Sequence, residues 1–164
     1  MFGLPRRFTL DTGELESRRR TLQGQAHPDR FAASGAAAQK MAMLWSARIN
    51  EAYGRLKQPL KRAAYLCELA GAPIDAENNT TMPAAFLATQ MAWRETLDAA
   101  TTPGTIDVLE REVGERRRAG QAALAAALDG PDANPAAAAG EVRALMFVER
   151  FARELAERRS ARGS

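Results

Sequence analysis

The residues best suited to chemistry form one triplet, His27-Pro28-Asp29. An imidazole near a carboxylate suits general base catalysis, but a catalytic histidine also needs an orienting partner and a pocket of converging polar groups. Alternatively, the triplet is a recognition tip. Pro28 fixes the backbone dihedral φ, so little ordering entropy is lost when Asp29 meets an arginine of a partner. The third interpretation is a plain turn between helices, with Asp29 as a cap.

The remaining sequence argues against catalysis and against a metal site. His27 is the only histidine and Cys67 the only cysteine, so the chain lacks soft ligands for a zinc or iron-sulfur site and cannot form an internal disulfide. It has no nucleophile motif and no glycine-rich phosphate loop. We therefore predict a protein that is not an enzyme and holds no cofactor or metal, with Cys67 in a buried packing role.

Three consecutive arginines, Arg18, Arg19 and Arg20, precede the triplet. The net charge is +3, but residues 1–71 carry twelve Lys or Arg against six Asp or Glu, a net +6, whereas residues 72–164 carry a net −3. Such a basic half steers a protein toward an acidic groove and makes binding sensitive to salt. A nucleic acid is the rival partner, but neither a groove-facing polar stripe nor aromatic residues among the basic ones is clear.

The composition predicts an all-α protein. Among 164 residues there are 35 alanines and only seven valines or isoleucines, so the core is thin and a large sheet is excluded. No uncharged stretch reaches the roughly 20 residues that a membrane-spanning helix needs, and no apolar signal run follows Arg6 and Arg7. We predict a cytoplasmic protein with no membrane partner.

The elements that would hold the triplet are two helices on either side of it. Asp11 and Glu14 form a capping pattern for a first helix, with Leu15, Leu22 and Ala26 on one face and an end at His27-Pro28. A long second helix is predicted over 36–57. Its apolar stripe, which is suited to packing, consists of Met41, Leu44, Trp45, Ile49, Ala52, Tyr53 and Leu56. Pro59 begins a third helix that stops at Gly71.

Residues 72–82 are rich in Pro, Asn and Thr, and we predict a linker there between modules at 1–71 and 83–164. Three further helices are predicted, each starting near a proline, over 83–100, 103–129 and 135–160, with Thr102 and Asn134 as caps of the last two. Short turns between long helices favour antiparallel neighbours, so the second module is predicted to be a three-helix bundle.

Several motifs together resemble a known family. A basic helix, an HPD loop and a long helix form an antiparallel pair similar to a J-domain. The resemblance extends over almost the whole chain to the HscB-type J-protein of bacterial iron-sulfur cluster assembly. It rests on the following segments: FGLP (2–5), LDTGEL (10–15), HPDRF (27–31), SARINEAYGRLKQPLKRAAYL (46–66) and AFLATQMAWRETLD (85–98).

The resemblance implies a co-chaperone with two partners. The J-domain would dock on a DnaK/HscA-class chaperone and stimulate its ATP hydrolysis, so the nucleotide belongs to the partner. The implied chaperone-binding residues are His27, Pro28, Asp29, Arg30, Arg18, Arg19 and Arg20. The C-terminal bundle would bind the IscU-type scaffold protein. The implied scaffold-binding residues are Leu87, Ala88, Met91, Ala92, Glu95, Ala99 and Phe147.

The second set departs from the family pattern at three positions. Ala88 replaces a larger apolar residue, and Ala92 and Ala99 stand where acidic residues are usual, which removes contact area and charge. A bundle-core role is the alternative for Leu87 and Met91. Of Phe147 and Phe151, four residues apart, we expect one in the core and one exposed.

The first module departs from the pattern before FGLP and before the triplet. The residues that form the family's short first helix do not precede FGLP here, which predicts a shortened first element. Gly24 and Ala26 replace larger residues, and a glycine within a helix costs about 1 kcal/mol, so the last turn of the first helix is predicted to be weak. Two alternatives to the HscB-type function stay open, a general J-protein for misfolded clients and a basic helical nucleic-acid-binding protein.

Overall fold

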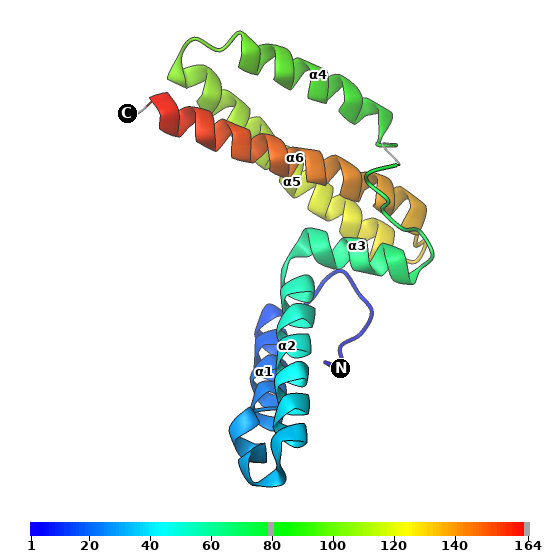
Figure 1. Ribbon diagram of the computed structural model, residues 1–164. Coiled ribbons are helices and arrows are strands. Elements are labelled where there is room, and N and C mark those ends of the chain that lie inside the picture. The colour runs from blue at the N-terminus through cyan, green and yellow to red at the C-terminus, as the bar shows by residue number, and fades with distance from the viewer. Residues whose placement is uncertain (79–80, 163–164) are drawn as a thin grey trace.

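The structure is a computed structural model that describes residues 1–78 and 81–162. These residues form six α-helices and no strand, which confirms the all-α prediction. The helices are α1 (Thr12–Gln25), α2 (Ala36–Lys57), α3 (Pro59–Leu69), α4 (Ala84–Asp98), α5 (Pro103–Asp129) and α6 (Pro135–Arg162), with a 3₁₀ helix η1 (Pro28–Ser34) between α1 and α2. Figure 1 shows the α1–α2 hairpin projecting from the layer of long helices.

The predicted helix boundaries are close to the observed ones because local signals set them. Asp11 accepts hydrogen bonds from the backbone N–H groups of Gly13 and Glu14 and caps α1, and Asn134 Oδ1 accepts one from Ala137 N at 3.0 Å at the start of α6. Thr102 occupies the cap position of α5, but its side chain makes no capping bond to the backbone. Its hydroxyl lies 3.1 Å from that of Thr105 instead.

The larger core lies between α3, α4, α5 and α6. Its centre holds an aromatic row in which Trp93 of α4 stacks on Phe151 of α6 at 5.4 Å between ring centroids, and Phe86 meets Phe147 edge to face at 5.7 Å. Burial of such rings is the largest apolar contribution available to a chain this rich in alanine. Cys67 is fully buried in this core, as expected, and burial raises the pKa of its thiol.

The hairpin has a much smaller core. Its buried residues are Phe2, Leu15 and Ile49, with Leu22 and Ala26 partly buried against them on the face predicted for α1. The predicted stripe of α2 is only half packed, because Met41, Leu44 and Trp45 each expose more than half of their surface. The prediction that they pack is wrong for a geometric reason. Helix α1 ends at Gln25, so the N-terminal part of α2 is covered only in part, by the short η1.

Helix α3 joins the hairpin to the bundle. It packs against α6 and α5, and Ala63 and Cys67 belong to the larger core. Two further ties meet at the N-terminal segment. The Asp129 carboxylate at the end of α5 accepts hydrogen bonds from Phe8 N at 2.6 Å and Thr9 N at 2.7 Å, and Arg62 Nε donates to Phe8 O at 2.8 Å. We call Phe8, Thr9, Arg62 and Asp129 the clasp.

Residues of the segment predicted as a linker are anchored on α6. Arg143, which is buried, donates from Nε to Thr81 O at 2.6 Å and from Nη1 to Ile74 O at 3.0 Å. The side chains of Ile74 and Met82 also pack on the larger core. The division into modules at 72–82 stays a prediction, and these bonds hold Ile74 and Thr81 against α6.

Candidate functional site

The His27-Pro28-Asp29 triplet occupies the far end of the hairpin. Helix α1 stops at Gln25, and His27 then acts as the N-cap of η1, with Pro28 in its first turn. The region predicted as a loop is therefore a short 3₁₀ helix, which the missing amide hydrogen of Pro28 and its fixed φ both permit. Gly35, with φ of +90°, closes the connection before α2 begins.

The triplet presents its polar atoms to solvent. The Asp29 side chain is 90% exposed and that of His27 is 57% exposed, with His27 Nδ1 3.5 Å from Asp29 Oδ2. His27 lines none of three cavities formed by the described residues, and its imidazole contacts Asp29 of the same triplet. An exposed carboxylate at the end of a projecting hairpin is suited to meeting a cation on another molecule.

Hydrogen bonds to backbone carbonyl groups hold the tip in place. Arg30 N donates to His27 O at 3.1 Å, and the Arg30 guanidinium donates to Gly24 O at 3.1 Å across the end of α1. Ser46 of α2 donates its hydroxyl to Ala26 O at 3.0 Å. Arg30 and Ser46 thus satisfy carbonyl groups that the end of α1 leaves free, at the glycine-containing last turn that is predicted to be weak.

The three arginines of α1 have different surroundings. Arg18 pairs with Glu14 at 2.6 Å and donates to Phe2 O at 2.6 Å. Arg19 is half-buried between Glu16 and the ring of Tyr53, whereas Arg20 is exposed. Only Arg20 is therefore largely open to a partner, and Arg18 and Arg19 also stabilise the hairpin.

The cluster of Glu16, Arg19 and Tyr53 was not predicted. Hydrogen bonds from Arg19 and from the Tyr53 hydroxyl lower the pKa of Glu16 to about 2. The spacing of Glu16 and Arg19 is a signal for a helical ion pair, but Tyr53 lies 37 residues away in the chain. Its place at this cluster depends on how α1 and α2 pack.

The second candidate surface lies on α4. Six of the predicted residues are exposed there and follow one another at helical spacing: Leu87, Ala88, Met91, Ala92, Glu95 and Ala99. Met91 is 65% exposed and Leu87 is 48% exposed, so the bundle-core interpretation of these two residues is wrong. We call these six residues the α4 face. It is an apolar strip with a carboxylate near one end, which is the form of a protein-binding surface.

Phe147 does not belong to this exposed set. It is 9% exposed and stacks on Phe151, which is fully buried, with 6.0 Å between ring centroids. The expectation that one of the two rings is exposed is wrong, because residues four apart share a face of α6 and that face is covered by α4. The Arg94 guanidinium lies 5.6 Å from the Phe147 ring, so Phe147 supports α4 from beneath.

The described residues contain neither a metal-binding cluster nor a membrane-spanning helix. No group of three or more His, Cys, Asp or Glu side chains is arranged to hold a metal ion in the described part of the chain. Within residues 1–78 and 81–162, no helix has both the length and the apolar character needed to cross a membrane.

Comparisons with known proteins give a consistent result. A family model for the HSCB C-terminal oligomerisation domain matches residues 82–156. The chain is 47% identical over 160 residues to a Cupriavidus taiwanensis protein named co-chaperone protein HscB homolog, covering 96% of this chain and 90% of that one.

Solved structures agree with this match. Chaperone HscB from Vibrio cholerae superposes with a TM-score of 0.79 at 34% identity over 98% of this chain and 95% of that one. The human co-chaperone HscB shares the fold at a TM-score of 0.85 and 24% identity, over 96% of this chain and 79% of that one. The chain belongs to the HscB family of co-chaperone proteins.

Proposed function

We propose that this chain is a J-protein adaptor of iron-sulfur cluster assembly in the cytoplasm. The hairpin tip would dock on a DnaK/HscA-class chaperone and stimulate its ATP hydrolysis, while the C-terminal bundle would bring the IscU-type scaffold as client. The chain itself would not hydrolyse ATP. The observation that carries the proposal is the 90% exposed Asp29 carboxylate on a tip fixed by Arg30 and Ser46.

The fixed tip supports docking for an energetic reason. An exposed carboxylate that is already oriented loses little entropy when an arginine binds it, so more of the charge-assisted hydrogen bond contributes to affinity. Arg20, exposed on α1, adds positive charge beside this site for steering toward an acidic groove. Pro28 and His27 shape the backbone that presents Asp29.

The α4 face supports scaffold binding. Leu87 and Met91 provide exposed apolar area, and Glu95 provides a charge that fixes orientation. Ala88, Ala92 and Ala99 make the strip flatter than larger side chains would, so they offer the scaffold less contact area and Glu95 is the charge of this face. Figure 1 places α4 on the side of the bundle away from the hairpin, which leaves both surfaces free at once.

Joining the two sites in one chain would affect how the chaperone meets its client. When the scaffold is bound to α4 and the tip is docked, the chaperone meets its client at a high effective concentration while its nucleotide state changes. The expected signature is synergy in ATP hydrolysis between this protein and the scaffold.

The test is steady-state ATP hydrolysis by the chaperone with this protein, with the scaffold, and with both. Asp29→Asn keeps the size of the side chain and removes its charge, so we expect folding and scaffold binding to persist while stimulation is lost. Stimulation retained by Asp29→Asn would refute the role of the tip. Stimulation without synergy, together with binding to unfolded chains, would favour the general J-protein.

A further inference from the structure

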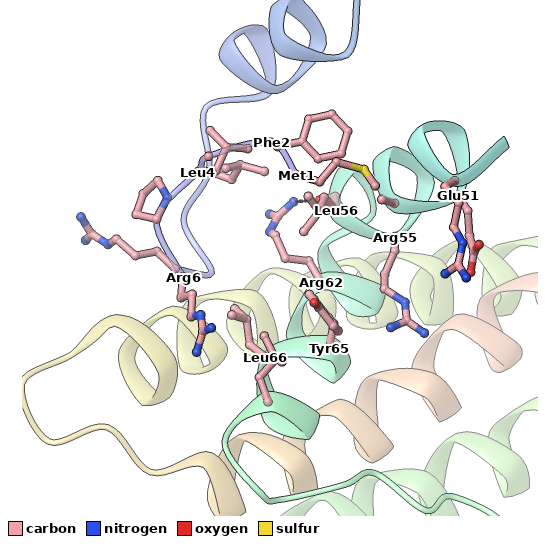
Figure 2. Close-up of a pocket in the computed structure, with 17 residues that line it drawn as sticks. Met1, Phe2, Leu4, Arg6, Glu51, Arg55, Leu56, Arg62, Tyr65 and Leu66 are labelled. Carbon is pink, nitrogen blue, oxygen red and sulfur yellow. Dashed lines mark hydrogen bonds between the residues drawn. The ribbon is translucent and has the colours of Figure 1, made fainter. Parts of the chain in front are cut away.

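A cavity of about 430 Å³ lies where the hairpin meets α3, well away from the tip (Figure 2). Its lining comes from the N-terminal segment, α2 and α3. Figure 2 shows Arg6, Arg55 and Arg62 reaching it from these three segments, with Leu56 and Leu66 on its wall. This volume is within the range of sites that hold a ligand or a few side chains of a partner.

The charge of the lining is strongly one-sided. Five arginines line the cavity, and the single carboxylate among the lining residues is Glu51. Arg55 has a partial partner in Glu68, 3.6 Å away. Arg48 and Arg6 are exposed on the rim. A cavity with several guanidinium groups and low-polarity walls attracts anions more strongly than an open surface with the same charge does.

The buried Arg62 is a separate indication of an anionic ligand. It is only 7% exposed, and desolvation lowers its pKa, with only partial opposition from Asp129. Its guanidinium donates to the carbonyl groups of Phe8 and Leu56, and no carboxylate of the described residues lies within ion-pair distance. A buried cation is ordinarily paired, so this one is suited to an incoming carboxylate.

The rest of the wall is aliphatic. Leu4, Leu10, Leu56, Leu66 and Leu69 line the cavity together with the ring of Tyr65. An inorganic anion would not contact this apolar area. A monocarboxylate with a long acyl chain would carry one negative charge, which pairs with only some of the arginines that the three segments supply. A short peptide with several carboxylates around one or two large apolar side chains uses both properties.

We propose that this cavity is a binding site for an acidic peptide segment of a partner protein, anchored by an apolar side chain against the leucines and held by the surrounding arginines. The site is distinct from the tip and from the α4 face, and the proposal does not depend on the function proposed above. It gives the chain a third contact surface, at the corner between hairpin and bundle.

The test is fluorescence anisotropy of the full chain with a labelled six-residue peptide in which Leu-Phe is flanked on each side by two Glu. The variant is Arg6→Glu with Arg48→Glu, both exposed on the rim, so folding is not at risk. The matched control is Arg111→Glu with Arg118→Glu on the exposed side of α5, outside the cavity lining. Circular dichroism checks that both variants stay folded.

We expect saturable binding that the rim variant weakens about tenfold or more and that the control leaves within about twofold. A peptide with Ser-Ser in place of Leu-Phe should bind more weakly than the parent. Absence of saturable binding, equal loss in the two variants, or equal binding of the Ser-Ser peptide would overturn the proposal. A twelve-residue oligothymidylate that binds more tightly than the peptide would overturn it in favour of a general polyanion site.

Discussion

Removing the Asp129 carboxylate should destabilise the whole protein, although Asp129 is only part-buried at the last position of α5. In the clasp it accepts hydrogen bonds from Phe8 N at 2.6 Å and Thr9 N at 2.7 Å. Hydrogen bonds to a charged group contribute about 1.5–3 kcal/mol each, and two of them share one carboxylate here. We therefore expect Asp129→Ala to lower the free energy of unfolding by about 2–4 kcal/mol, since the part-buried Phe8 amide loses its partner.

The pH dependence of this loss follows from the pKa of Asp129. Burial favours the protonated carboxyl, but the backbone hydrogen bonds from Thr9 and Phe8 outweigh it and hold the pKa of Asp129 below its ordinary value of 3.8. A depressed pKa in the folded state gives stability that is present above 3.8 and is lost as the pH falls through the folded value. The difference between wild type and Asp129→Ala should thus be full at pH 7 and shrink below pH 3.8.

The assay is urea unfolding at several pH values, followed by circular dichroism. In thermal unfolding, a loss of 1 kcal/mol corresponds to a decrease of roughly 2–4 °C in Tm for a chain of this size. Asp132→Ala is the matched control, because Asp132 is exposed three residues further on. It should change stability by less than about 0.5 kcal/mol. Equal effects of the two substitutions at pH 7 would refute the clasp as a stabilising contact.

Three other substitutions test separate parts of the structure. Gly120→Ala would place a Cβ atom 2.6 Å from Oε1 of Glu141, which is buried and held by two hydrogen bonds from Arg116. Because that side chain can move only by giving up its ion pair, thermal unfolding should show a loss of about 1–3 kcal/mol despite the better helix propensity of alanine. An unchanged or raised Tm would contradict that close crossing. The wild-type protein should lose stability as the pH falls from 4.5 to about 2, because Glu16 has a depressed pKa and stabilises the fold only while it is ionised. Glu16→Gln should make this loss smaller. An unchanged pH profile would argue against the cluster. Phe147→Ala should lower the free energy of unfolding by about 3–5 kcal/mol. Met91→Ala should change that free energy by less than about 0.5 kcal/mol and weaken scaffold binding measured by calorimetry. The opposite pattern would reverse the assignment of core and surface.

Local signals explain why the helices could be predicted closely. Proline marks the first turn of α3, α5 and α6, and Asp11 and Asn134 are capping residues whose bonds involve only their own helix. The exposed triplet was found for the same reason, because Pro28 fixes its backbone wherever the rest of the chain lies. The 3₁₀ form of η1 was missed, since a short segment after a proline has no periodicity to recognise.

The sequence by itself determined the helical class, the helix boundaries, the charge of the hairpin and the residue types at the tip, because these depend on neighbours within a turn or two. Only the tertiary structure decided which apolar stripes are covered. Periodicity treats Met41, Met91 and Phe147 alike, yet the first two are exposed and the third is buried, because burial depends on which helix lies opposite. The clasp likewise joins Phe8 to Asp129, 121 residues apart, and no local pattern encodes a partner at that separation.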